Sequence, residues 1–183
     1  MRLVLLMMLG GVAQAKAPDI NLLVVDTRDF TLTAWTAAGP DRAVEIGLGQ
    51  GWGPKEELGD LKTPRGAYYV VDKQKGQLGG RWGAFYGGYW IKINYPGPVD
   101  AVRGLDRGWI DDATATRIID AWQAGKLTPQ NTRLGGGVGL HGWASEWDGR
   151  GGAHLSFGCV VLHNADMAQL FDRIAIGALV VIL

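Results

Sequence analysis

The residues best suited to chemistry lie between positions 154 and 163, HLSFGCVVLH, which contain the only cysteine of the chain, Cys159. A thiol becomes a strong nucleophile when it loses its proton, and a nearby histidine can accept that proton. His141 lies 18 residues before the cysteine, in the sequence GLHG. This pattern predicts a cysteine nucleophile with His141 as its general base.

Attack on a carbonyl produces an oxyanion, which needs N–H donors aimed at it. Gly158 and Cys159 are the natural donors, because glycine permits a tight turn that points both N–H groups inward. We expect Ser156, at the start of this turn, to orient either the turn or the substrate. The same stretch therefore predicts both a nucleophile and an oxyanion hole.

His154 and His163 bound the same stretch and are two further candidates. With Cys159 they could form a metal site, but their spacing matches no common zinc pattern and only one thiolate is available. We therefore expect no metal, and no cofactor. If the strand reaches position 163, His163 shares a face with Cys159. That leaves a supporting role at the cleft open, beside a simpler position at the end of the strand.

Two glycine-containing segments precede the cysteine. The run GGGVGLH at 135–141 is not followed by Gly-Lys-Ser/Thr, so it is not a phosphate-binding loop. We expect its glycines to let a strand pass close to other backbone and bring His141 to the cleft. In GDLKTPRG at 59–66, proline and glycine predict a rigid turn. Lys62 and Arg65 are then either plain turn residues, which we favour, or contacts for a substrate carboxylate.

The chain has 183 residues with 18 basic and 18 acidic side chains, and no basic run that would favour nucleic acid. Residues 1–15 combine one positive side chain, a short apolar core and a small-x-small end, which predicts a secretory signal peptide. We expect residues 16–183 to form one soluble exported domain, since no other segment is apolar enough to span a membrane. A single cysteine in an exported protein is a reactive thiol, an intermolecular crosslink or a buried apolar residue, and its neighbours favour the first.

Hydrophobic patterns predict mostly strands, at residues 21–25, 30–35, 43–48, 67–71, 89–94, 160–162 and 178–183, with a hairpin turn at 27–29. Apolar residues at helical spacing predict one helix between 110 and 124 and another from Asn164 to Gly177. The first helix is expected to be an insertion that covers another part of the domain. The fold class is therefore mainly β, a largely antiparallel sandwich or barrel with about eight strands and two helices.

The motifs also resemble those of a known family. His141-Gly142, followed later by Ser156-Phe-Gly-Cys159, is similar to the signature of the L,D-transpeptidase catalytic domain, the YkuD family. The similarity extends to GDLKTPRGAY at 59–68, GVGLHG at 137–142 and CVVLHNAD at 159–166. It therefore covers most of the chain after residue 15, in the right order, and implies a single catalytic domain with a β-sandwich-like fold.

The resemblance implies an exported enzyme, periplasmic in a bacterium with two membranes, that acts on peptidoglycan. In that family the cysteine attacks the carbonyl of the third residue of a stem peptide, releases the terminal D-alanine and forms a thioester. An amine, from a second stem or from a wall-anchored protein, then takes the acyl group. Carried over, Cys159 is the nucleophile, His141 the general base, and Gly158 and Cys159 the oxyanion donors. Supporting or substrate contacts would come from Ser156, Gly142 and Trp143.

Two positions depart from the family pattern. Many members have His where this chain has Phe157, and Arg or Asn where it has Val161. Neither position carries the nucleophile or the base, so both catalytic roles survive, while substrate contacts change. With water as acceptor, the same thioester would make the protein a carboxypeptidase or an amidase-type hydrolase. Without catalysis, the fold would be a wall-binding module.

Eight tryptophans are a high number for a chain of this length. Trp143 and Trp147 follow His141 closely, and with Trp109 and Trp122 they are candidates to line a groove for a stem peptide or glycan. For each of them taken individually, packing in the core or in loops is the default interpretation.

Overall fold

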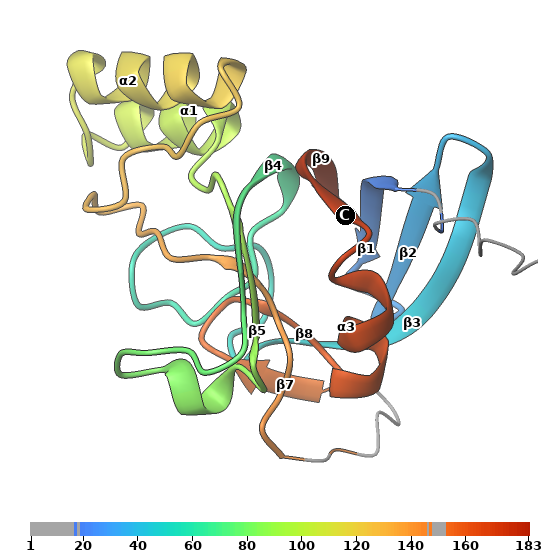
Figure 1. The fold of residues 1–183 in the computed structure, drawn as a ribbon. Coiled ribbons are helices and arrows are strands. Elements are labelled where there is room, and N and C mark those ends of the chain that lie inside the picture. Colours follow the sequence, from blue (N-terminus) through green and yellow to red (C-terminus); the bar gives the residue numbers. More distant parts are fainter. Residues whose placement is uncertain (1–16, 18, 146, 148–152) are drawn as a thin grey trace, which may run out of the picture.

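The computed structural model describes residues 17, 19–145, 147 and 153–183, and the expected signal peptide, residues 1–15, lies outside them. The described part of the chain is mainly β, as predicted (Figure 1). Its strands are β1 (Ile20–Asp26), β2 (Thr31–Thr36), β3 (Gly39–Gly49), β4 (Gly66–Lys75), β5 (Tyr89–Ile93), β6 (Gly139–His141), β7 (Ala153–Ser156), β8 (Val160–Leu162) and β9 (Ile174–Ile182). Its helices are α1 (Pro98–Asp106), α2 (Asp112–Gln123), α3 (Asn164–Leu170) and the short 3-10 helix η1 (Gly83–Phe85).

The strands close into a barrel, because the long strand β3 takes part in both halves of the sheet. The strand order is β2-β1-β9-β4-β5-β6-β8-β3-β7, and a further pairing joins β2 to β3. The first half of β3 pairs with β2, and its second half pairs with β8 on one side and β7 on the other. Most neighbours are antiparallel, as expected, while β1–β9, β3–β7 and β6–β8 are parallel.

Alternating side chains of these strands form the main core. Leu23 and Val25 of β1, and Val180 and Ile182 of β9, are fully or almost fully buried, and Met167 attaches α3 to the same core. Burying one such side chain stabilises the fold by about 1.5–3 kcal/mol. The predicted hairpin between the first two strands is also present, since β1 and β2 pair antiparallel.

Helices α1 and α2 form a hairpin that extends from one end of the barrel (Figure 1). The prediction of α2 is confirmed: the Asp111 side chain caps its N-terminus by accepting the Thr114 N–H at 2.8 Å, and Gly125 follows its end with φ +62°. α1 was not predicted, because this helix turns small residues inward. Ala101 and Gly104 are buried, whereas its larger apolar side chains are exposed.

The second predicted helix is wrong in its length, because α3 ends at Leu170 and Ile174 already belongs to β9. Met167 in α3 and Ile174 in β9 are both buried. Their spacing of seven residues is that of one helix face, although they belong to two different elements. Gly177 ends no helix. It lies within β9 at φ +83°, where the strand bulges against β1.

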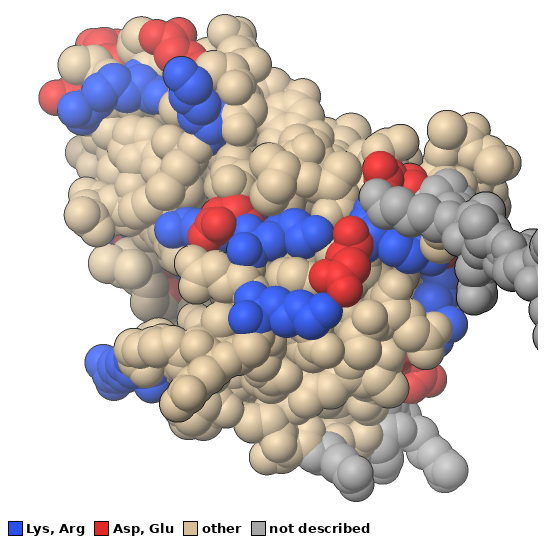
Figure 2. Space-filling model, in the orientation of Figure 1, with Lys and Arg blue, Asp and Glu red and all other residues tan. Residues whose placement is uncertain are grey.

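Charged side chains of opposite sign are interspersed over the surface. In Figure 2, Lys and Arg lie beside Asp and Glu on the face in view, with wide uncharged areas between them. This distribution agrees with the equal numbers of basic and acidic residues in the chain. None of the helices in the described residues has the length and apolarity needed to cross a membrane.

Candidate active site

The turn between β7 and β8 places Cys159 directly before β8. Ser156, the last residue of β7, accepts the Gly158 N–H at 3.1 Å and donates to the Cys159 carbonyl at 2.6 Å. Gly158 has φ +131°, and a side chain there would come within 2.7 Å of the Lys62 carbonyl. Of the two expected functions of Ser156, these contacts support orientation of the turn.

The same contacts correct part of the expected oxyanion hole. The Gly158 N–H is already donated to Ser156, so it does not point into the cleft. Among the hydrogen bonds of the described residues, none uses the Cys159 N–H. The Cys159 N–H therefore stays a candidate donor, and Gly158 contributes through its backbone conformation.

The Cys159 residue is partly exposed, and its thiol lies among backbone groups of the segment before β6. Sγ donates to the Gly137 carbonyl at 3.8 Å. Burial raises the pKa of the thiol to about 11, although the Gly139 N–H and the positive charge of Lys55 act in the opposite direction. At neutral pH the thiol therefore keeps its proton.

Strand β6 carries His141 into the same region. β6 pairs in parallel with β8, so that His141 lies opposite Val161, two residues after Cys159. Gly139 makes this approach possible, since any side chain there would overlap the Ile91 carbonyl. His141 is buried, with 3% of its surface exposed.

The hydrogen bond of the imidazole fixes its tautomer. Nδ1 lies 2.5 Å from the Gly142 carbonyl, which can only accept, so Nδ1 carries the proton and Nε2 is left able to accept one. Burial lowers the pKa of His141 to about 4, against a smaller opposite effect of the Gly142 carbonyl. At neutral pH the imidazole is uncharged, which is the form that a general base requires.

Aromatic rings surround this imidazole. Tyr86 lies 4.8 Å from His141 between ring centroids, and Trp90 and Trp143 each lie at 6.2 Å. Burial, and secondarily the charge of Cys159, raise the pKa of Tyr86 to about 12. Tyr86 and Trp90 were not predicted as site residues, because aromatic residues in or beside a strand are ordinarily core residues.

Cys159 and His141 face one cavity of about 810 Å³. Ser156, Phe157 and Gly158 belong to its lining, together with Gly136, Gly137 and Val138 before β6. Lys55 is the one cation among the described lining residues, and no Asp or Glu is among them. The lining is thus mostly uncharged, with Lys55 as its one charged residue among those described.

One side of this cavity is an aromatic rim, formed by Trp82, Phe85, Trp143 and Phe157. Trp82 contacts Phe157 at 5.0 Å and Phe85 at 5.7 Å, and Phe85 lies 6.5 Å from Trp143. Phe157 is 54% exposed, so it presents an open ring at the position where many family members have His.

Of the four tryptophans expected at a groove, the structure places only Trp143 in this lining. Trp122 donates its indole N–H to the Ala67 carbonyl at 2.9 Å, and Trp109 packs beside the helical hairpin, so both follow the packing interpretation. Trp147 stacks on His163 at 3.9 Å.

The segment after His141 is held by Asn164, the first residue of α3. The Trp143 N–H donates to Asn164 Oδ1 at 3.0 Å. A side chain at Gly142 would overlap this oxygen and lie 3.0 Å from the Tyr86 carbonyl. Gly142 thus supports the site by letting the chain pass close to α3, and Asn164 is a supporting residue that sequence reasoning treated only as a helix cap.

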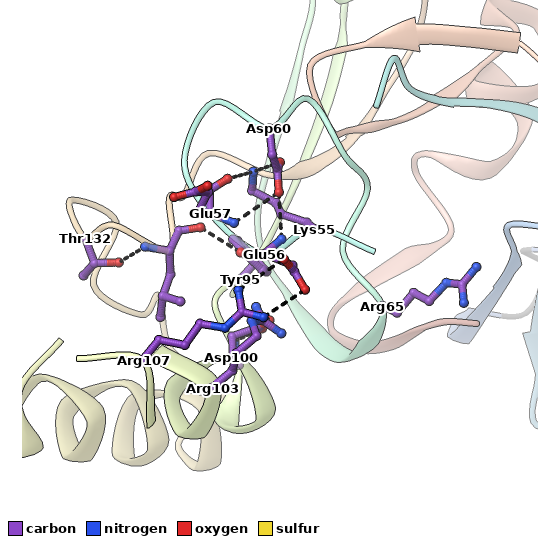
Figure 3. Close-up of polar contacts among 12 residues, drawn as sticks. Lys55, Glu56, Glu57, Asp60, Arg65, Tyr95, Asp100, Arg103, Arg107 and Thr132 are labelled. Atoms are coloured by element: carbon purple, nitrogen blue, oxygen red, sulfur yellow. Dashed lines mark hydrogen bonds and ion pairs between the residues drawn. The ribbon is translucent and has the colours of Figure 1, made fainter. Parts of the chain in front are cut away.

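The remaining candidates, His154, His163 and Arg65, are not among the described residues that line the cavity. His154 Nδ1 lies 2.6 Å from the Gly49 carbonyl and its ring lies against Trp52, while His163 stacks on Trp147. No group of three His, Cys, Asp or Glu side chains within the described residues is placed to hold a metal. Arg65 donates to Thr27 and points away from the cluster around Lys55 (Figure 3).

Fold and site together define a mainly β domain with a thiol and a neutral imidazole in one cavity. The chain belongs to the L,D-transpeptidase catalytic domain family, YkuD, whose model matches residues 20–182. No curated protein matches the chain.

Solved structures share the fold at low sequence identity. The helical cell shape determining protein Pgp2 from Campylobacter jejuni is 21% identical with a TM-score of 0.59, over 90% of this chain and 48% of Pgp2. Bd1075 from Bdellovibrio bacteriovorus is 21% identical with a TM-score of 0.56, over 93% of this chain and 50% of Bd1075. The L,D-transpeptidase LdtMt1, in complex with imipenem, is 15% identical with a TM-score of 0.53, over 90% of this chain and 59% of LdtMt1. The chain thus spans about half the length of the first two.

Proposed function

We propose that the protein is an exported peptidoglycan L,D-transpeptidase that uses Cys159 as nucleophile and His141 as general base. Family membership supports the reaction class. The observation that carries the proposal is the imidazole whose Nδ1 proton is committed to the Gly142 carbonyl, in the cavity that also holds the one cysteine of the chain. An unprotonated Nε2 and a protonated thiol that line the same cavity are the groups needed for general-base attack.

In the first half of the reaction, the Cys159 sulfur bonds to the carbonyl carbon of the third residue of a stem peptide, while the thiol proton passes to His141 Nε2. The carbonyl oxygen becomes an oxyanion, for which the Cys159 N–H is the proposed donor. The tetrahedral intermediate then collapses, the bond to the terminal D-alanine breaks, and His141 returns the proton to the leaving amine. A thioester remains on Cys159.

In the second half, an amine attacks the thioester and His141 takes a proton from it. The carbon–sulfur bond breaks, an amide forms, and the proton restores the thiol. The acceptor is proposed to be a second stem peptide, with a wall-anchored protein as the other candidate. Water in its place would give a carboxypeptidase or an amidase-type hydrolase.

The proposed site of action is the cell wall outside the cytoplasm, which is the periplasm in a bacterium with two membranes. The similarity of fold to Pgp2, a helical cell shape determining protein, makes cell shape the proposed biological outcome. This extension rests on the fold alone.

The experiment is to incubate the protein with a defined tetrapeptide stem, with and without an amine acceptor, and to measure the masses of both protein and products. We expect an acyl adduct at Cys159, release of D-alanine, and a crosslinked product only when the amine is present. Continued turnover to a hydrolysed stem peptide without the amine would instead assign a hydrolase. Cys159→Ala and His141→Gln should abolish or greatly reduce turnover, and a fully active Cys159→Ala variant would contradict the proposal.

Imipenem provides an independent probe, since LdtMt1 has been solved in complex with it. We expect a mass increase of one imipenem on the intact protein and none on Cys159→Ala. Binding to peptidoglycan sacculi without any adduct at Cys159 would instead assign a non-catalytic wall-binding module.

A further inference from the structure

One wall of the catalytic cavity comes from the loop between β3 and β4, and this loop contains a buried ammonium group. Only 5% of the Lys55 side chain is exposed, although lysine is rarely buried without a partner. Its Nζ donates to Asp60 Oδ1 at 2.8 Å and to the Glu57 carbonyl at 2.9 Å. An ammonium group has three donors, so these two bonds leave one N–H available.

The partner carboxylate is itself held firmly. Asp60 accepts the N–H groups of Glu56, Glu57 and Lys62 at 2.7, 3.1 and 3.1 Å (Figure 3). Burial raises the pKa of Asp60, but the hydrogen bonds from Lys55 and from these N–H groups outweigh it, so the pKa lies below its ordinary value. Asp60 is therefore a carboxylate at neutral pH, and it fixes the position of the Lys55 ammonium.

Outside this pair, two ion pairs connect the loop to the region of the helical hairpin. Arg107 contacts Glu56 at 3.2 Å (Figure 3). Arg133 contacts Glu57 at 3.4 Å. Both pairs are exposed and contribute little stability individually. Together with the Asp60 contacts, these ion pairs fix the position of the β3–β4 loop at Glu56 and Glu57.

Lys55 also lies against the glycine segment that surrounds the thiol. A Cβ placed on Gly135 would be 3.4 Å from Lys55 Cε. The same segment continues to the Gly137 carbonyl and the Gly139 N–H, the backbone groups that face Sγ. Among the described residues, the titratable side chains that line the cavity with Cys159 are His141 from β6, Tyr86 from the segment before β5, and Lys55 from the loop before β4.

We propose that Lys55, fixed by Asp60, is a positioning residue that places a positive charge beside Cys159 and so favours negative charge on the sulfur. His141 and Tyr86 are uncharged at neutral pH, so Lys55 supplies the cation of the described cavity lining. Asp60 fixes the ammonium and also partly neutralises it. The inference rests on the proposed role of Cys159 as nucleophile, but not on any particular substrate.

The test is the rate of Cys159 alkylation by iodoacetamide as a function of pH. In this reaction the thiolate forms a carbon–sulfur bond, iodide leaves and the thiol proton goes to solvent. Lys55→Met keeps most of the side-chain stem and removes the charge, so we expect alkylation at pH 8 to slow about three- to tenfold. Lys55→Arg keeps a charge and should restore at least half of the lost rate.

Asp60→Asn separates this role from a structural one, because it removes the counter-charge and leaves Lys55 unneutralised. We expect alkylation about threefold faster than in the unmodified protein, the opposite sign to Lys55→Met. Lys62→Met is the matched control, since Lys62 lies on the same loop but outside the described cavity lining. Its alkylation rate should stay within about twofold of that of the unmodified protein. Near-ultraviolet circular dichroism checks that each variant is folded.

Equal rates for Lys55→Met and the unmodified protein, or equal slowing by Lys55→Met and Lys62→Met, would overturn the inference. If Asp60→Asn does not fold, the alkylation rates of Lys55→Met and Lys55→Arg test the inference instead. If Lys55 acted only through packing, Lys55→Arg would not recover the rate lost in Lys55→Met. The proposed function can fail separately. If the protein does not turn over stem peptides but the variants show the expected alkylation rates, the proposed transpeptidase function is contradicted and the proposed role of Lys55 stands.

Discussion

At the scale of single residues, His141 and Cys159 are both uncharged at neutral pH, because burial lowers the pKa of the imidazole and raises that of the thiol. The structure therefore does not contain a preformed thiolate–imidazolium pair. Charge would arise only as the thiol attacks, when the proton moves to Nε2. This order of events places the greatest electrostatic demand on the transition state, where a fixed cation such as Lys55 acts most strongly.

The buried neutral imidazole leads to a prediction about stability. The pKa of His141 is about 4 in the folded protein, against 6.5 as its ordinary value, so the unfolded chain binds a proton that the folded protein does not. The contribution is fully present above pH 6.5 and is lost as pH falls toward 4. We expect it to lower the free energy of unfolding by about 2 kcal/mol between pH 7 and pH 5.

Urea unfolding at these two pH values measures this change. His141→Asn is the control, since asparagine does not titrate and the other ionisable groups stay the same. The loss between pH 7 and pH 5 should be about 2 kcal/mol smaller in the variant. The same pH dependence in both proteins would show that the folded imidazole titrates normally.

At the scale of elements, local patterns were enough to predict most strands and the thiol–imidazole pair. A compact apolar run identifies β1, and alternating apolar residues identify β2, because one face of that strand is buried in the barrel. The single cysteine and the histidine of GLHG are visible in the sequence itself. The environment of the pair was not, since Lys55 and Tyr86 reach it from loops whose paths depend on tertiary contacts.

The two helices that were not predicted correctly share one physical reason: the spacing of apolar residues in the sequence does not always show which side chains are buried. α1 buries Ala101 and Gly104 against Leu134 and exposes Val99 and Val102, the reverse of the pattern used to recognise a helix. Ile174 is buried like a helix residue but belongs to β9. In both cases the neighbouring element, and not the local sequence, decides which face is covered.

The contact between the segment after β6 and the start of α3 leads to a second prediction. Gly142→Ala would place a methyl group against Asn164 Oδ1 and displace the segment that carries Trp143. We expect a loss of about 1–3 kcal/mol in the free energy of unfolding, as for other overpacked sites. Thermal or urea unfolding measures it.

Gly79→Ala is the matched control, because a Cβ on Gly79 meets no atom within 4 Å. Its effect should stay within about 0.5 kcal/mol. If the clash with Asn164 is the cause, the double variant Gly142→Ala/Asn164→Ala should be less destabilised than the sum of the two single variants. An additive double variant would assign the loss to the backbone at Gly142 instead.

At the scale of the whole molecule, two hydrophobic clusters divide the structure. The barrel has the main core, whereas the helical hairpin has a small core of its own, formed by Ala101, Ala115, Ile118 and Leu134. A third prediction follows: Ile118→Ala should destabilise the hairpin by about 2–5 kcal/mol, because Ile118 is fully buried. Hydrogen exchange should accelerate in α2 while amides of β1 and β9 stay protected.

Ile176→Ala is the control for this experiment, since Ile176 is 61% exposed in β9 and its truncation opens no cavity. It should leave exchange in α2 unchanged. Equal acceleration in α2 and in the barrel strands after Ile118→Ala would show that the two clusters unfold as one unit.

The position of β9 has a consequence for how the protein is made. β9 lies between β1 and β4, and it pairs with the first strand in parallel across most of the length of the chain. Before residues 174–182 are synthesised, β1 and β4 each have an unpaired edge, and such edges are sites of aggregation. Such distant pairing also slows folding. The barrel therefore closes only after residues 174–182 have been synthesised and can pair with both β1 and β4.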